Sequence, residues 1–116
     1  MTERSGDSPK PAAVRPRVVL VGPPGAGKTT IGQRLAAALN LPFRDTDADI
    51  VAIAGKPIPE IFIDDGEEAF RAMERAAVAE ALSTFDGVLA LGGGAVLAPS
   101  TRELLREHTV VYLSVE

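Results

Sequence analysis

Short apolar segments alternate along the chain with longer segments of helical periodicity. Residues 18–21 (Val-Val-Leu-Val) form a β-branched apolar run, which is typical of a strand buried on both faces. In residues 28–40, Ile31, Leu35 and Leu39 recur every four positions. This spacing predicts an amphipathic helix with those three side chains as its apolar stripe.

The same patterns predict the remaining elements. The expected strands are residues 43–47, 87–91 and 109–115. The expected helices are residues 49–54, 59–63, 67–84 and 99–107. Strands that alternate with helices indicate an α/β fold, in which a parallel sheet lies between helices on both faces. We therefore predict a three-layer αβα architecture.

The two ends of the sequence differ from the middle. Residues 1–16 contain three prolines, scattered charge and no apolar period, which predicts a disordered N-terminal tail before a domain at residues 17–116. The last expected strand reaches the end of the sequence, where an α/β layer usually continues with another helix and strand. We therefore expect residues 17–116 to be a C-terminally truncated domain.

Composition excludes several classes of function. The chain has 116 residues, with 12 Lys and Arg against 16 Asp and Glu, and the resulting charge of −4 argues against a nucleic-acid-binding face. It has no Cys and one His, so disulfides and a usual zinc site are excluded. No apolar run approaches the roughly 20 residues of a membrane helix, and no secretory signal is evident. We expect a soluble cytoplasmic protein.

Residues 22–29 (Gly-Pro-Pro-Gly-Ala-Gly-Lys-Thr) fit the pattern G-x-x-x-x-G-K-[ST], between an expected buried strand and an expected helix. Glycines let such a loop turn tightly, so that its N–H groups and the helix N-terminus surround phosphate oxygens. In this pattern Lys28 reaches the β- and γ-phosphates of a nucleotide, and the Thr29 hydroxyl is a Mg²⁺ ligand. The sequence therefore predicts a nucleoside triphosphate site.

No clean apolar run followed by Asp closes the third or fourth expected strand, but Asp45 and Asp47 lie at the end of the second. Residues two apart on a strand face the same side, at the edge where parallel sheets bind ligands. One carboxylate could hold Mg²⁺ through water, and the other could accept a proton from a substrate hydroxyl. Alternatively, both acids belong to a solvated turn with helix-capping side chains, as Asp49 nearby suggests.

Arg71 follows the expected core residue Phe70, and Glu67 and Glu74 lie four residues before it and three after it. An arginine oriented in this way suits the capture of a carboxylate, although spacing alone fits an exposed helix ion pair better. Residues 92–94 (Gly-Gly-Gly) fit an anion contact and a simple tight turn equally well. The isolated His108 fits a loop position.

The complete set of motifs resembles the shikimate kinase family. It comprises the loop at residues 22–30, Asp45-Thr46-Asp47, Ile61-Phe62, Asp65-Gly66-Glu67, Phe70-Arg71, Glu74 and Leu91-Gly92-Gly93-Gly94-Ala95. The resemblance runs from about residue 18 to residue 116. It implies a P-loop kinase fold and transfer of the ATP γ-phosphoryl group to the 3-hydroxyl of shikimate, in aromatic amino-acid biosynthesis.

The resemblance also implies a role for each matching residue. The ATP-binding residues would be Gly25, Ala26, Gly27, Lys28, Thr29 and Thr30. Thr29 and Asp45 would hold Mg²⁺, and Lys28 and Asp47 would be catalytic, with Asp47 as the base. Shikimate would contact Asp47, Arg71 (steadied by Glu74), Gly92, Gly93, Gly94, Phe62 and Phe70.

Two departures qualify these expectations. Val51 stands where the family commonly has Glu. The family also continues past the fourth strand with an arginine-bearing lid, a second substrate-binding arginine and an adenine-contacting segment, so we expect impaired catalysis by these 116 residues. The alternatives are a catalytically silent nucleotide-binding module and a kinase for gluconate or a nucleoside monophosphate. The expected partners are ATP and shikimate, without nucleic acid or membrane, and the expected state is a monomer.

Overall fold

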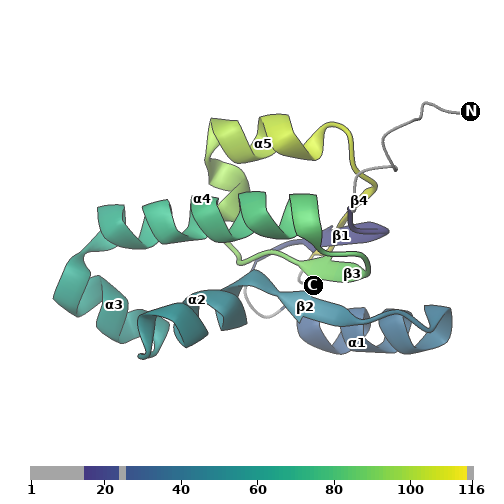
Figure 1. Cartoon of the computed structure of the whole chain (residues 1–116), viewed down its shortest axis with the longest axis horizontal. Helices are drawn as coiled ribbons and strands as arrows, with labels where there is room; N and C mark the ends of the chain where they lie inside the picture. The colour runs from purple at the N-terminus through teal and green to yellow at the C-terminus, as the bar shows by residue number, and fades with distance from the viewer. Residues whose placement is uncertain (1–14, 24–25, 115–116) are drawn as a thin grey trace, which may run out of the picture.

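The computed structural model describes residues 15–23 and 26–114. A four-stranded parallel sheet lies at its centre (Figure 1), with the strand order β2-β3-β1-β4. The strands are β1 (Val18–Val21), β2 (Phe43–Asp45), β3 (Val88–Ala90) and β4 (Val110–Tyr112). The helices are α1 (Lys28–Leu39), α2 (Thr46–Ala54), α3 (Ile58–Asp65), α4 (Glu67–Thr84) and α5 (Pro99–Leu105), with a 3₁₀ turn, η1 (Ala95–Leu97), before α5. The expected tail lies outside the described residues, apart from its last two positions.

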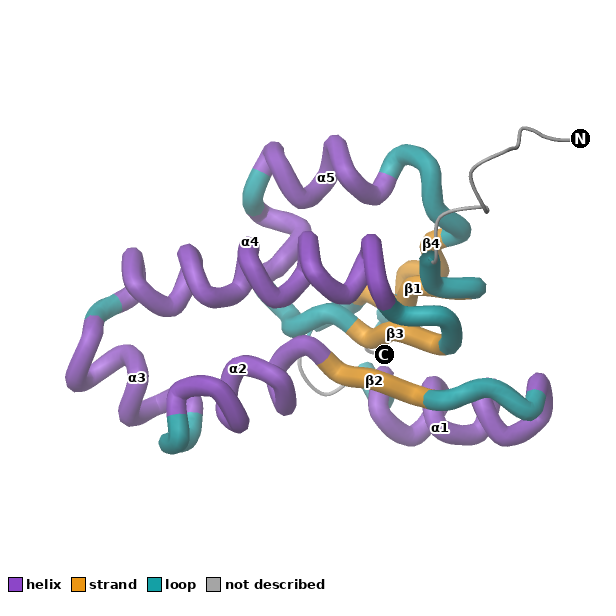
Figure 2. The backbone as a smooth tube through the Cα atoms, in the orientation of Figure 1, coloured by secondary structure: helices purple, strands orange, loops and turns teal. Residues whose placement is uncertain are grey.

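The sheet lies between two layers of helices, as Figure 2 shows for α1 on one side and α4 and α5 on the other. Val19 and Leu89 face the α4 and α5 layer, in a core cluster that includes Val78 and Leu105. On the opposite face, Leu20 belongs to a second cluster that includes residues of α1. Because β1 and β3 are buried on both sides, their sequences are continuously apolar. The predicted three-layer fold with a parallel sheet is confirmed.

Helix α1 contacts the sheet through the small residues Gly32 and Ala36 and, of the predicted stripe, through Leu35 alone. Gly32 and Ala36 are buried, whereas Ile31 and Leu39 are 42% and 50% exposed. A Cβ atom on Gly32 would lie 2.3 Å from the ring of Phe43. The helix therefore approaches the sheet so closely that only small side chains fit between them, and the larger ones flank the contact.

The predicted strand at residues 43–47 is wrong at its end. Strand β2 stops at Asp45, and α2 begins at Thr46. The Asp45 carboxylate accepts a hydrogen bond from the Asp47 N–H at 2.8 Å, so it is the N-cap of α2. The cap satisfies one of the N–H groups that have no partner within the helix at its start, so the chain enters α2 two residues before the predicted end of the strand. Other boundaries differ by one to three residues, and η1 was not predicted.

Helices α2 and α3 extend beyond the sheet beside the first half of α4 (Figure 1). Ile50, Ile61 and Phe70 join these helices in a third apolar cluster. Lys56, just after α2, forms ion pairs with the last two residues of α3 at 3.1 and 2.9 Å. Among the residues that the structure describes, no helix is both long and apolar enough to span a bilayer.

Candidate active site

The phosphate-binding loop joins β1 to α1, and Lys28 and Thr29 are the first two residues of that helix. The Lys28 ammonium donates hydrogen bonds to the carbonyl oxygens of Gly22 at 2.7 Å and Pro23 at 3.1 Å. The Thr29 hydroxyl donates to the Asp45 carboxylate at 3.4 Å. These contacts bring the loop and the end of β2 together, although Gly25 lies outside the described residues.

A cavity of about 320 Å³ lies between the loop and the carboxyl ends of the strands. It is lined by Gly27, Lys28, Thr29, Thr30, Asp45, Asp47 and Leu91. Because β1, β2 and β3 are parallel, their carboxyl ends meet at one edge of the sheet, where open α/β sheets bind ligands. The structure therefore places both predicted aspartates beside the predicted phosphate-binding residues.

The Asp47 carboxyl lies in an electrostatically mixed environment. Burial raises its pKa above the ordinary value for Asp. The carboxylates of Asp45 and Glu74 raise that pKa further, while the cations of Lys28 and Arg71 lower it. Two anions and two cations, from β2, α1 and α4, thus act on one carboxyl group. A carboxylate with a raised pKa is a stronger proton acceptor than an ordinary Asp, as a general base requires.

The raised pKa gives a testable effect on stability. The pKa of Asp47 is higher in the folded state than in the unfolded chain, so the folded state holds this proton more tightly. As pH rises from the unfolded-state pKa through the folded-state pKa, ionisation of Asp47 therefore lowers the free energy of unfolding. We expect Asp47→Asn to raise that free energy at about pH 7 and to leave it nearly unchanged at about pH 3, where Asp47 is protonated in both states. Urea unfolding at the two pH values measures the difference.

Asp49→Asn is the matched control for this prediction, since it makes the same change two residues further along α2. Asp49 accepts a hydrogen bond from Arg44 at 2.7 Å, so its replacement is expected to lower the free energy of unfolding at about pH 7. A lower free energy of unfolding for Asp47→Asn than for the wild type at about pH 7 would contradict the electrostatic account of Asp47.

Arg71, in the first turns of α4, is held by several contacts. Its guanidinium lies 3.0 Å from the carboxylate of Glu74, 3.6 Å from that of Glu67, and 5.4 Å from the ring centre of Phe70. Glu74 is only 4% exposed, so it has little access to water and depends on Arg71 for a partner. This arrangement differs from the exposed helix ion pair that spacing alone favoured, because Glu74 is buried and Arg71 is held by Glu74, Glu67 and Phe70.

The glycines after β3 are in close contact with both halves of the site. A Cβ atom on Gly92 would lie 2.3 Å from an Asp47 carboxylate oxygen, and one on Gly94 would lie 2.6 Å from the Arg71 guanidinium. Real Cβ atoms essentially never approach another atom so closely. A side chain at either position would therefore force the Asp47 carboxylate or the Arg71 guanidinium out of its present place.

A second cavity, of about 270 Å³, opens beside Arg71. Its lining residues are Arg71, Glu74, Arg75, Gly94, Leu97, Ala98 and Pro99. Phe62 and Phe70 line neither of the two cavities, although their rings stack with centres 4.8 Å apart. Arg75 also lines this cavity and was not among the predicted residues, although its position four residues after Arg71 places both on one helix face.

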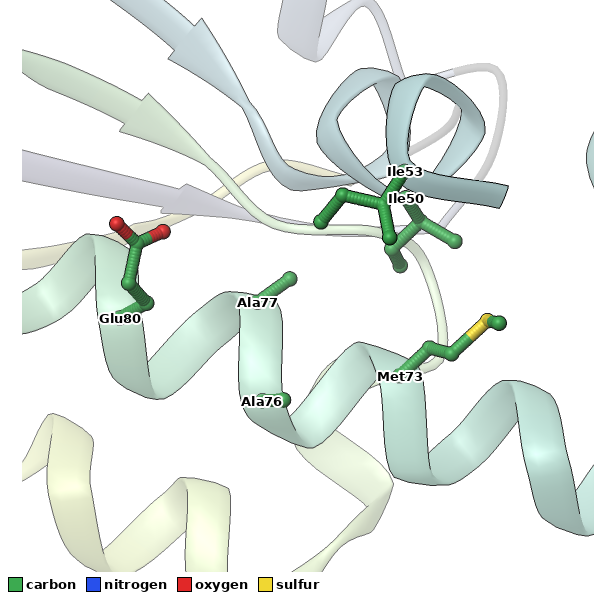
Figure 3. Close-up of a pocket in the computed structure, with 6 residues that line it drawn as sticks. All are labelled: Ile50, Ile53, Met73, Ala76, Ala77 and Glu80. Atoms are coloured by element: carbon green, nitrogen blue, oxygen red, sulfur yellow. The ribbon is translucent and has the colours of Figure 1, made fainter. Parts of the chain in front are cut away.

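A third cavity, of about 470 Å³, lies away from these residues, between α2 and α4. Figure 3 shows Ile50 and Ile53 of α2 facing Met73 and Ala77 of α4 across it, with Glu80 at one end. The Arg44 guanidinium donates a hydrogen bond to the Glu80 carboxylate at 2.8 Å. None of the sequence-predicted site residues lines this cavity, so its size does not make it the candidate site.

Comparisons with known proteins agree with this geometry. The family model described as shikimate kinase matches residues 24–116. Shikimate kinase from Salinispora arenicola is 68% identical over 101 residues, which cover 87% of this chain and 60% of the relative. Shikimate kinase from Saccharopolyspora erythraea is 64% identical over 100 residues, with 86% and 57% covered. The chain thus spans about 60% of the length of the curated relatives it matches.

Solved structures give the same result. Shikimate kinase from Acinetobacter baumannii, in complex with shikimate, superposes with a TM-score of 0.78 at 40% identity, covering 89% of this chain and 57% of that one. Shikimate kinase from Aquifex aeolicus superposes with a TM-score of 0.77 at 30% identity, covering 86% and 60%.

Proposed function

The chain belongs to the shikimate kinase family, and from that premise we propose that it binds ATP and shikimate and transfers the γ-phosphoryl group to the 3-hydroxyl of shikimate. The observation that carries this proposal is the position of Asp47. Its carboxylate shares a cavity with Lys28 and lies against Gly92, while Gly94, two residues further along the same turn, lies against Arg71. A phosphate site, a proton acceptor and a carboxylate-binding cation are thus neighbours.

Each residue has a role in the proposed reaction. Arg71 pairs with the shikimate carboxylate and orients the ring, so that the 3-hydroxyl reaches Asp47. The hydroxyl oxygen forms a bond to the γ-phosphorus, the bond to the β,γ-bridging oxygen breaks, and ADP leaves with that electron pair. The hydroxyl proton passes to Asp47. Lys28 stabilises the negative charge on the transferred group.

The oxygen atoms near the loop fit a magnesium ion bound with the nucleotide. Thr29 and Asp45 provide two hard oxygen donors 3.4 Å apart, and Mg²⁺ typically uses one or two protein ligands and completes its shell with water and phosphate oxygens. When bound, the ion would neutralise charge on the phosphates. The described residues contain no cluster of three or more His, Cys, Asp and Glu side chains that could hold a metal by themselves, which agrees with a nucleotide-borne ion.

The test is a coupled assay of ADP release from MgATP with shikimate, gluconate or AMP as acceptor, run beside calorimetric titration of each ligand. Of the three acceptors, we expect only shikimate to bind and to promote ADP release from MgATP, with formation of shikimate 3-phosphate. Turnover on AMP or gluconate without turnover on shikimate would overturn the proposal. Binding of MgATP with no transfer to any acceptor would support a nucleotide-binding module for these 116 residues instead.

A further inference from the structure

Thr46 is a fully buried polar residue between the two site aspartates. It is the first residue of α2, and a buried hydroxyl in such a place costs stability unless it is hydrogen-bonded. Its Oγ1 atom accepts a hydrogen bond from the backbone N–H of Gly92 at 3.2 Å. The two residues are 46 positions apart, so this contact joins α2 to the glycine turn after β3.

The hydrogen bond replaces one that the sheet cannot make. Strands β2 and β3 are paired as far as Asp45 and Ala90. Beyond them, the Leu91 N–H donates to Leu20 of β1 at 3.0 Å, so the next N–H, that of Gly92, points toward the β2 side. There the chain has already turned into α2 and offers no strand carbonyl. The Thr46 hydroxyl supplies the missing acceptor.

Gly92 lies directly beside the Asp47 carboxylate. The Cα hydrogen side of Gly92 faces the Asp47 carboxylate so closely that a Cβ atom would lie 2.3 Å from it. Two residues later, Gly94 has the same relation to Arg71, at 2.6 Å. The turn therefore borders both side chains, and a movement of the turn relative to α2 would crowd or free the Asp47 carboxylate and the Arg71 guanidinium.

We propose that Thr46 is a positioning residue, whose hydroxyl fixes the glycine turn against α2 and thereby keeps Gly92 and Gly94 where they leave room for the Asp47 and Arg71 side chains. Thr46 acts through Gly92 and does not touch the substrate. The proposal rests on the proposed function for its consequence, shikimate binding, but the contact itself can be tested without any ligand.

The test compares Thr46→Val, which keeps the shape and loses the hydroxyl, with Thr46→Ser, which keeps the hydroxyl. In Thr46→Val we expect the Gly92 amide hydrogen to exchange about tenfold faster or more. We expect the shikimate Kd to rise by about fivefold or more, within the roughly 150-fold limit that one unpaired buried donor sets. We expect the MgATP Kd to change less than about twofold, since the loop is untouched. Thr46→Ser is expected to restore the wild-type exchange rate and shikimate Kd.

Thr101→Val is the matched control, because Thr101 is also buried, at 2% exposure, but lies in α5 and lines neither site cavity. It is expected to lower stability without changing Gly92 exchange or shikimate affinity. Unchanged Gly92 exchange in Thr46→Val, or failure of Thr46→Ser to restore it, would overturn the proposal, as would an unchanged shikimate Kd. If the wild-type chain binds no shikimate, the proposed function fails, whereas the exchange rates still support or refute the positioning contact.

Discussion

Replacement of Lys28 by methionine is expected to weaken MgATP binding by about 100-fold. The Lys28 ammonium is held over the loop by the carbonyl oxygens of Gly22 and Pro23, at 2.7 and 3.1 Å, so it is already positioned where the β- and γ-phosphates bind. A hydrogen bond to a charged group is worth about 1.5–3 kcal/mol, and two such contacts with phosphate oxygens correspond to a loss near 3 kcal/mol. Methionine keeps the apolar stem and removes only the charge and its donors. Calorimetric titration with MgATP measures the loss.

Lys56→Met is the control, because it makes the same substitution outside the site. Lys56 pairs with Asp64 and Asp65 at the end of α3, so its loss is expected to affect stability and not MgATP affinity. Similar MgATP affinities for the two variants would contradict the assigned role of Lys28.

The phosphate-binding loop could be predicted from sequence because its function depends on local features. A glycine-rich segment between an apolar strand and a helix positions Lys28 and Thr29 without help from distant residues, and the structure places both as predicted at the start of α1. The parallel sheet was equally predictable, since β1 and β3 are apolar throughout. The prediction of the loop and the prediction of the sheet both use patterns of neighbouring residues, and neither pattern depends on which distant residues lie nearby.

The remaining site depends on contacts between segments far apart in the sequence. Asp45 and Asp47 were predicted to share a side through strand alternation, yet they are neighbours because one caps the helix that carries the other. The side chain that a Cβ atom at position 92 would meet is that of Asp47, 45 residues earlier. A pattern of neighbouring residues cannot predict a contact over that separation. The contact of Thr46 could not be predicted for the same reason, because its partner is a backbone N–H in the turn after β3.

Of the predicted apolar stripe of α1, Leu35 packs against the core, whereas Ile31 and Leu39 are exposed for a related reason. Periodicity identifies large apolar side chains, but the helix approaches the sheet through Gly32 and Ala36, which a hydrophobicity pattern hardly registers. Close approach of a helix to a sheet selects small residues, so the contact surface is decided by the partner, here Phe43.

Arg71→Ala is expected to weaken shikimate binding by about 100-fold. The guanidinium is fixed by Glu74 at 3.0 Å and rests 5.4 Å from the ring centre of Phe70, so it is oriented before a ligand arrives. A carboxylate paired with an oriented arginine gains two charge-assisted hydrogen bonds, worth about 1.5–3 kcal/mol each before the cost of desolvation is subtracted. Arg71→Lys is expected to recover only part of this affinity, because lysine keeps the charge but not the planar pair of donors.

Loss of Arg71 also leaves Glu74 buried without its partner, so Arg71→Ala alone could lower affinity simply by destabilising α4. The double variant Arg71→Ala/Glu74→Gln removes that unpaired charge, and we expect it to recover folding stability in urea without recovering shikimate affinity. Arg75→Ala is the matched control, since Arg75 is exposed and lines the same cavity one turn further along α4; its shikimate Kd should rise less than about threefold, the effect of an exposed charge. Recovery of shikimate binding in the double variant would mean that Arg71 stabilises the helix and does not hold the substrate carboxylate.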